Sequence, residues 1–145
     1  MATVKRFEDL HVWQSAREFV KLIYRLTNQE VFARDFALKD QIRRAASSIM
    51  HNIAEGFGAG SDSEFIRFLG YARRSGAETQ SQLYTALDEE YITKIQFDDL
   101  YARSTQILKQ INSLIGYLDN SRKNNRTIKE EQTNYFIEAP DQSDR

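Results

Sequence analysis

His11 and His51 are the side chains best suited to bind a metal ion or to move a proton near neutral pH. His51 precedes Glu55 by four residues, a spacing that places both on one face of a helix. Zinc takes three or four ligands, mostly from histidine and cysteine, and the chain contains no cysteine. We therefore expect no metal centre and interpret both histidines as surface or interface residues.

Nucleophilic and phosphate-binding motifs are also missing from the sequence. The chain has no Gly-x-Ser-x-Gly segment and no glycine-rich loop followed by lysine. Gly56, Gly58 and Gly60 have G-x-G-x-G spacing, but no strand precedes them, so we expect a loop between helices. The sequence predicts no catalytic residue and no cofactor site, and hence a protein that is not an enzyme.

A strip of short polar side chains is more informative. Gln41, Ser48, Asn52 and Glu55 recur at offsets of 0, 7, 11 and 14, which places them together beside an apolar stripe on one helix. Polar groups on such a seam suggest hydrogen bonds to another helix, since unpaired polar groups are costly to bury. On the following helical segment, Arg67 and Glu78 are candidate partners. Contact within the chain, contact between subunits and ligand recognition all remain open.

Charge is balanced overall but segregated along the chain. The net charge is −1. Residues 61–99 hold four basic and eight acidic side chains, whereas residues 100–126 hold five basic side chains and one acidic one. This distribution permits one basic face, although arginines on helices often form only a solvated surface. The candidates for binding phosphate are Arg43, Arg44, Arg73, Arg74, Arg122, Lys123 and Arg126.

Helical periodicity dominates the rest of the chain. Apolar residues recur every three or four positions, and the one proline is Pro140. Capping residues are expected at Asp35, at Ser61 with Glu64, and at Thr93 with Gln96. The predicted helices span about 8–28, 36–57, 62–91 and 94–120.

Short connections between these helices predict that neighbours run antiparallel. The expected fold is all-α: an up-down-up-down four-helix bundle formed by residues 1–120. Residues 121–145 are polar and are expected to form a mobile tail.

Glycines and aromatic residues point to close packing and to a contact surface. Gly70, Gly76 and Gly116 lie inside predicted helices, where glycine persists best if another group approaches closely. Several aromatic residues lie near predicted helix ends or off the apolar stripes, and some of them should be exposed. They are Phe32, Phe36, Phe57, Tyr84, Tyr91, Phe97 and Tyr101.

Location is predicted from composition. Residues 1–9 are charged and contain no apolar run typical of a signal peptide, and no segment approaches the length of a membrane-spanning helix. The absence of cysteine suits a reducing compartment. We expect a cytoplasmic protein without a membrane partner.

Three segments carry a family resemblance. Leu10-His-Val-Trp-Gln-Ser-Ala16, Leu38-x-x-Gln41-Ile-Arg-Arg-Ala45 and Ile49-x-x-Asn52-Ile-Ala-Glu-Gly-Phe57 resemble the four-helix-bundle proteins encoded in intervening sequences of bacterial 23S ribosomal RNA genes. The resemblance spans roughly residues 7–118. The third helix of the family usually reads Gly-Ser-x-x-Glu. Here Arg74 stands at the glycine position, while Ser75 and Glu78 fit.

The resemblance implies an antiparallel bundle that assembles as a ring of five subunits. It also implies kinship with accessory proteins of diversity-generating retroelements, which bind nucleic acid and a reverse transcriptase through a basic surface. The expected function is a non-enzymatic homo-oligomeric scaffold that binds RNA or other nucleic acid through a limited basic patch. The alternative is a protein-interaction adaptor without nucleic-acid binding.

Overall fold

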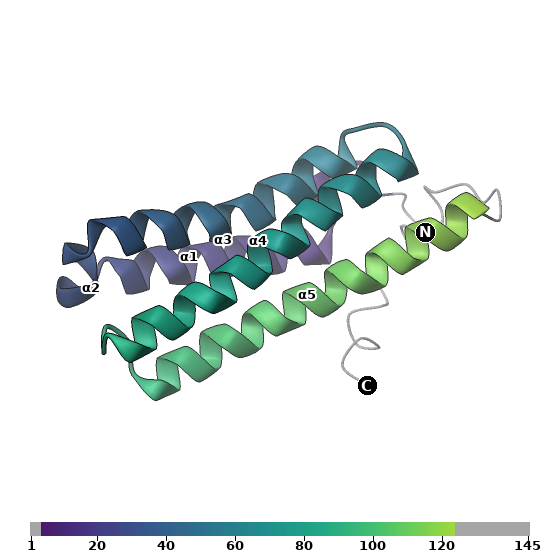
Figure 1. Cartoon of the computed structure of the whole chain (residues 1–145). Coiled ribbons are helices and arrows are strands. Elements are labelled where there is room, and N and C mark those ends of the chain that lie inside the picture. The colour runs from purple at the N-terminus through teal and green to yellow at the C-terminus, as the bar shows by residue number, and fades with distance from the viewer. Residues whose placement is uncertain (1–3, 124–145) are drawn as a thin grey trace.

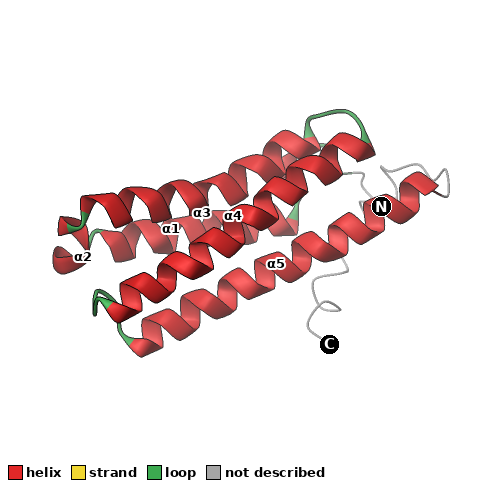
Figure 2. Cartoon of the chain, viewed as in Figure 1, coloured by secondary structure: helices red, strands yellow, loops and turns green. Residues whose placement is uncertain are grey.

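The computed structural model describes residues 4–123, and helices are the only regular structure in that range (Figures 1 and 2). Four helices are long and two are short. In chain order they are η1 (Phe7–Asp9), α1 (His11–Thr27), α2 (Glu30–Arg34), α3 (Phe36–Phe57), α4 (Asp62–Asp88) and α5 (Lys94–Lys123). The predicted all-helical fold is confirmed for the described residues.

The start of the first predicted helix differs from expectation. Instead of one helix from residue 8, a 3-10 turn ends at Asp9 and α1 begins at His11. Leu10 separates them in an extended conformation, with φ −77° and ψ 125°, and is completely buried. The break allows the ring of Phe7 to pack edge-on against Trp13, with ring centroids 5.0 Å apart.

The short helix α2 was not predicted, because five residues are too few to show helical periodicity. It buries Phe32 completely and ends at Arg34, and the side chain of the next residue, Asp35, caps α3. α1 ends at Thr27, one residue before the predicted end, and Asn28 follows it with a φ of −81°.

The far end of the chain also differs from prediction. α5 continues to Lys123, so residues 121–123, predicted to belong to the tail, are helical. Ser121 is buried, and Arg122 and Lys123 form ion pairs with Asp119 one turn earlier, a favourable position for cations near a helix C-terminus. The rest of the predicted tail, residues 124–145 with Arg126, lies outside the described residues.

The predicted helix caps are present. The Asp35 carboxylate accepts a hydrogen bond from the backbone N–H of Leu38 at 3.0 Å. The Ser61 hydroxyl accepts from the Glu64 N–H at 3.2 Å, but the Glu64 carboxylate bonds to Arg67 instead of returning to Ser61.

Thr93 and Gln96 form the reciprocal capping box. The Gln96 N–H donates to the Thr93 hydroxyl at 3.1 Å, and the Thr93 N–H donates to the Gln96 side chain at 2.8 Å. The helix before this cap, α4, ends at Asp88 rather than at the predicted Tyr91. Glu90 adopts a φ of +60° just after it, which turns the chain toward α5.

The four long helices pack side by side in a bundle-like arrangement. α3 packs against α1 and α4, and α5 packs against α4 and α1, so the four surround one interior (Figure 1). Contacts between α4 and α5 run in opposite orders along the two helices: Ser63 with Arg122, Arg73 with Asn112, and Gln80 with Ser104.

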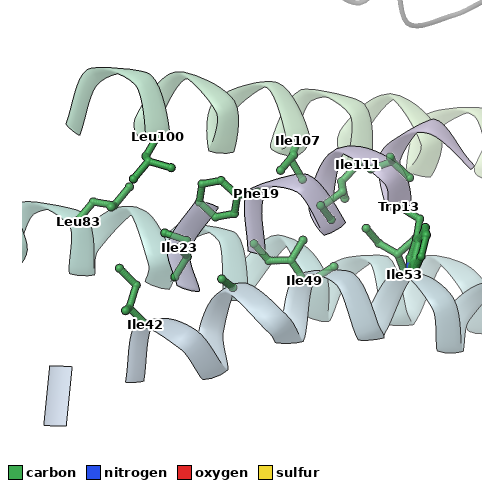
Figure 3. Packing of buried hydrophobic residues seen from close by; sticks show 14 of the residues in the cluster. Trp13, Phe19, Ile23, Ile42, Ile49, Ile53, Leu83, Leu100, Ile107 and Ile111 are labelled. Carbon is green, nitrogen blue, oxygen red and sulfur yellow. The ribbon is translucent and has the colours of Figure 1, made fainter. Parts of the chain in front are cut away.

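The interior is formed by the apolar stripes that periodicity predicted. Figure 3 shows Phe19 and Ile23 from α1, Ile42 and Ile49 from α3, and residues from α4 and α5 pointing toward one another. Five interior side chains from α1, α3 and α5 are at most 2% exposed: Phe19, Ile23, Ile42, Ile49 and Ile107. This continuous cluster holds the helices in register and determines which faces remain outside.

Candidate interaction surfaces

The polar strip on α3 is used partly within the chain. The hydroxyl of Ser75 on α4 donates to the Ser48 hydroxyl at 2.8 Å. The Asn52 amide donates to the Ser48 hydroxyl at 2.9 Å and to the Ser48 carbonyl at 2.8 Å. Ser48 therefore ties α3 to α4, and Asn52 supports it from within α3. At these two positions the strip makes contacts within the chain.

The other residues of the strip lie on the outer surface. Gln41 and Glu55 are exposed, and their side chains form no hydrogen bond or ion pair within residues 4–123. Glu78 accepts a hydrogen bond from Gln82, its neighbour one turn on, at 3.2 Å. The strip residues of α3 and α4 are thus not gathered into one site.

Arg67 is held by its own helix. Its guanidinium forms two hydrogen bonds of 2.8 Å with the Glu64 carboxylate and one of 2.8 Å with the Tyr71 hydroxyl. It also lies over the ring of Phe68, 5.0 Å from the ring centroid. The bonds to Glu64 raise the pKa of Arg67 and lower the pKa of Glu64. This charge is engaged locally on the surface of α4.

Arg43 joins α3 to the end of α1. Its Nε donates to the Thr27 hydroxyl at 2.8 Å, and a terminal nitrogen donates to the Asn28 side-chain oxygen at 2.9 Å. The guanidinium also stacks over Tyr24, 4.4 Å from the ring centroid. Arg43 thus contributes to packing between two helices, and these contacts already occupy the guanidinium that was predicted to bind phosphate.

Three further candidates for binding phosphate, Arg44, Arg73 and Arg74, differ in whether a carboxylate neutralises their charge. Arg44 forms an ion pair with Asp40 at 2.9 Å. Arg73 donates to the neutral side chain of Asn112 at 3.0 Å, and Arg74 lies over the Tyr71 ring. Arg73 and Arg74 are exposed and form no ion pair with any described carboxylate.

Arg122 and Lys123 lie at the opposite end of the bundle from Arg43. Arg122 bonds to Asp119 at 2.6 Å and to Ser63 at 3.0 Å, and Lys123 pairs with Asp119 at 3.1 Å. Lys123 and then Arg122 lower the pKa of Asp119. Arg43 contacts the end of α1, whereas Arg122 contacts the start of α4, so the described basic candidates are spread along the molecule.

Exposed apolar side chains gather at one end, the end that contains α2. Among the described residues, five large hydrophobic side chains are exposed, and all belong to helix turns that meet there (Figure 1). We call this group the α2-end patch; it consists of Tyr24 (42% exposed), Val31 (57%), Phe36 (73%), Tyr84 (50%) and Ile95 (82%).

The sequence predicted this patch only in part. Phe36 and Tyr84 were expected candidates, but Phe32 and Phe97, also named, are buried at 0% and 5% exposure. Val31 and Ile95 were missed, although an apolar residue in a first helical turn and off the main stripe is the available signal.

A hydrogen-bonded cluster closes the same end. The Tyr91 hydroxyl donates to the second oxygen of the Asp35 carboxylate at 2.9 Å, while the first oxygen caps α3. The Tyr91 ring packs against Phe32, with centroids 5.2 Å apart. The bond to Asp35 is the main cause that raises the pKa of Tyr91. The α4–α5 loop is thereby fastened to the α2–α3 junction.

A surface cleft of about 200 Å³ lies between α1 and α5 near this end. Leucines form much of its wall, and Arg25 and Asp99 supply one charge of each sign, with Asp99 paired to Arg103 at 3.1 Å. The cleft can admit a small apolar group, but its lining contains no nucleophile beside a base. Its residues are Leu22, Arg25, Leu26, Gln29, Gln96, Asp99 and Leu100.

Glycines divide into two kinds. A Cβ at Gly56 would lie 2.9 Å from atoms of both Phe65 and Phe68, and one at Gly76 would lie 2.7 Å from Leu108. At Gly70 and Gly116 a Cβ would meet nothing within 4 Å. Glycine in a helix interior costs about 1 kcal/mol relative to alanine. The chain's own packing explains that cost at Gly56 and Gly76 but not at the other two.

Residues 4–123 contain neither a cluster suited to a metal ion nor a helix suited to a membrane. No three histidine, aspartate or glutamate side chains gather there as a metal site would require. None of the helices in this range has the length and apolar character needed to cross a membrane.

Most of the chain matches the sequence model of a known protein family. The sequence model described as 23S rRNA-intervening sequence protein matches residues 8–113. The chain belongs to this 23S rRNA-intervening sequence protein family. The resemblance inferred from the three motif segments is confirmed, and the match runs from η1 well into α5.

A solved structure from the S23 ribosomal protein family is similar to this intervening sequence protein. It is the crystal structure of a protein of unknown function from Bacteroides thetaiotaomicron, with a TM-score of 0.67 and 33% sequence identity. The similarity covers 72% of this chain and 97% of that chain. No curated protein matches the chain.

Proposed function

We propose that this protein is a non-enzymatic, homo-oligomeric scaffold built on an antiparallel, up-down-up-down four-helix bundle. The reversed order of the α4–α5 contacts supports this topology, and so do the short connections between the long helices. The cytoplasm stays the predicted location.

The α2-end patch is the observation that carries the scaffold role. Large apolar side chains gathered at one end of a small protein mark a contact site more often than an inert surface. Aromatic side chains cover about 150–250 Å² each when fully buried, so the three partly exposed aromatic residues contribute about 300 Å². Val31 and Ile95 add to this area. A stable interface buries roughly 800 Å² per partner, which this patch with its polar surroundings can supply.

The test is the molar mass of the full chain in solution, measured by light scattering after size exclusion over a range of concentrations. We expect a species several times heavier than the 16.9 kDa chain. The ring of five implied by the family resemblance predicts a mass five times that of the chain. A mass equal to one chain at every concentration would refute the homo-oligomer.

Nucleic-acid binding is the second candidate function. Arg73 and Arg74 favour it, because both are exposed and neither forms an ion pair with a described carboxylate. Binding of labelled RNA should then weaken strongly between about 50 and 200 mM salt. Arg73→Glu with Arg74→Glu should weaken it more than Arg44→Glu, whose guanidinium is already paired with Asp40. No binding at low salt would exclude this function.

An adaptor that binds another protein is the alternative without nucleic acid. It would retain a stoichiometric protein partner after nuclease treatment and bind no RNA at low salt. Substituting Phe36→Glu and Ile95→Glu in the α2-end patch should release that partner, whereas Gln41→Glu on the outer face of α3 should not.

A further inference from the structure

Gly70 and Gly116 form an open position shared by two neighbouring helices. Arg73 of α4 bonds to Asn112 of α5, Gly70 lies one turn before Arg73, and Gly116 lies one turn after Asn112. Because contacts along α4 and α5 run in opposite orders, both steps lead toward the same end of the bundle. The two glycines therefore lie at one level, and a Cβ at either position would meet no atom of the described chain within 4 Å.

The outer face of α4 and α5 also separates unlike charges. Arg73, Arg74 and Lys109 are exposed near the glycines and form no ion pair among the described residues. At the α2 end, the exposed carboxylates at the end of α4 form no ion pair within residues 4–123 either. They are Asp88, Glu89 and Glu90, and the exposed side chains of Tyr84 and Ile95 belong to the neighbouring turns.

We propose that this α4–α5 face is covered by a second copy of the chain. The acidic end of one copy, with Tyr84 and Ile95, contacts the basic segment of the next, where the glycines permit close approach. This inference rests on the homo-oligomer proposed above and assigns its interface.

Charge complementarity favours a second copy over a nucleic acid. The same face carries three carboxylates without cationic partners at one end, which would repel phosphate, whereas another copy offers an arginine pair to them. Open glycines also suit the approach of a protruding side chain such as Ile95, which is 82% exposed.

Charge reversal tests the pairing of the two ends. Glu89→Lys with Glu90→Lys makes the acidic end basic, and Arg73→Glu with Arg74→Glu makes the basic segment acidic. Each pair alone should weaken self-association at least tenfold in sedimentation experiments. Combining all four substitutions in one chain should restore it, because unlike charges then meet again at every contact.

The matched control reverses the charges of an ion pair on another helix, α3. Asp40→Arg with Arg44→Asp reverses an exposed ion pair on α3 and should leave the mass unchanged. If both reversals on the α4–α5 face assemble like the wild type, the interface lies elsewhere and the inference fails, while the homo-oligomer stands.

Steric substitution tests the glycines. Gly116→Leu should reduce self-association at least tenfold. The circular dichroism spectrum should remain that of a helical protein, and at concentrations where both proteins are monomeric the melting temperature should be at least that of the wild type. Ala37→Leu, at an exposed position on α3, is the control. Gly70→Leu provides a second variant on the neighbouring helix, and normal assembly of both glycine variants would overturn the inference.

Two further outcomes separate this inference from the other proposals. If Arg73→Glu with Arg74→Glu abolishes RNA binding but leaves the mass unchanged, the basic segment belongs to a nucleic-acid site and the inference fails. If the wild-type chain is monomeric at every concentration, both the inference and the homo-oligomer fail.

Discussion

Glycines inside helices occur both at the α3–α4 seam, the contact around Ser48, Gly56 and Ser75, and on the outer α4–α5 face. The two regions differ in what surrounds these glycines. Along the seam, the side chains of Phe65 and Phe68 pack against Gly56, and the Ser75 hydroxyl donates a hydrogen bond to the Ser48 hydroxyl. On the outer face, no atom of the described chain would lie within 4 Å of a Cβ at Gly70 or Gly116.

The difference shows how to separate a structural residue from a candidate contact residue. A glycine whose missing Cβ is replaced by a neighbour's atoms is explained by the fold. A glycine in a helix interior with open space above it lowers stability without any compensation inside the chain. The stability of the chain should therefore respond in opposite directions to alanine in the two regions.

Gly56→Ala should have the largest effect. The new Cβ would lie 2.9 Å from Phe65 and Phe68 and 3.3 Å from a backbone oxygen, so the helices must separate slightly. Overpacking of this kind costs about 1–3 kcal/mol, and we expect about 2 kcal/mol less free energy of unfolding in urea titrations. Gly58→Ala is the control, since its nearest atoms lie at 3.7 Å or more. Equal urea midpoints for the two variants would show that the seam is not tightly packed.

Ser48→Ala should destabilise the seam by a smaller amount. It removes an acceptor for the Ser75 hydroxyl and for the Asn52 amide, both partly buried. The loss should be about 1–2 kcal/mol, the usual cost of leaving buried polar groups unsatisfied. Ser81→Ala, at an exposed position on α4, should change the free energy of unfolding little. A similar loss at both serines would contradict a specific role for the seam.

Gly70→Ala and Gly116→Ala should have the opposite sign. Each should raise the free energy of unfolding by about 1 kcal/mol, because alanine favours helix and meets no neighbouring atom. The measurement belongs at protein concentrations low enough for the chain to be monomeric. A destabilising effect there would mean that the chain itself packs over these glycines, which would remove the contrast between the two regions.

Tyr91→Phe should have the smallest and most pH-dependent effect. The bond to Asp35 raises the pKa of Tyr91 in the folded state above the ordinary value of 10.0. Its stabilising contribution is therefore fully present below about pH 10 and is lost as the pH rises through the raised pKa.

Urea midpoints of the wild type and Tyr91→Phe should accordingly differ below the ordinary pKa of tyrosine and converge as the pH rises through the raised pKa of Tyr91. Tyr84→Phe, at the half-exposed tyrosine of the α2-end patch, controls for alkaline effects unrelated to Asp35. A difference between wild type and Tyr91→Phe that stays constant across this range would argue against the hydrogen bond.

Some features of the site could be predicted because they depend on neighbours in sequence. The caps at Asp35 and Thr93 arise within one helical turn, so the residues that form them are visible side by side. Ser48 and Asn52 were recognised for the same reason. Ser75, the partner of Ser48 on α4, was not among the predicted site residues, since which residue of α4 faces Ser48 depends on how the two helices align.

Other features depend on contacts between distant segments. Arg43 looks like a phosphate ligand in the sequence, but the structure places it against Thr27 and Asn28. Tyr91 and Asp35 are 56 residues apart and meet only because the loop after α4 folds onto the start of α3. The openness of Gly70 and Gly116 likewise becomes visible only when every neighbouring helix is in place.

Apolar periodicity and local capping in the sequence determined the four long helices, and three short motif segments indicated the family to which the chain belongs. Only the tertiary structure decided which polar and basic groups face a neighbouring helix and which face outward. That choice depends on the register and rotation with which whole helices pack, and these follow from the fit of many side chains at once.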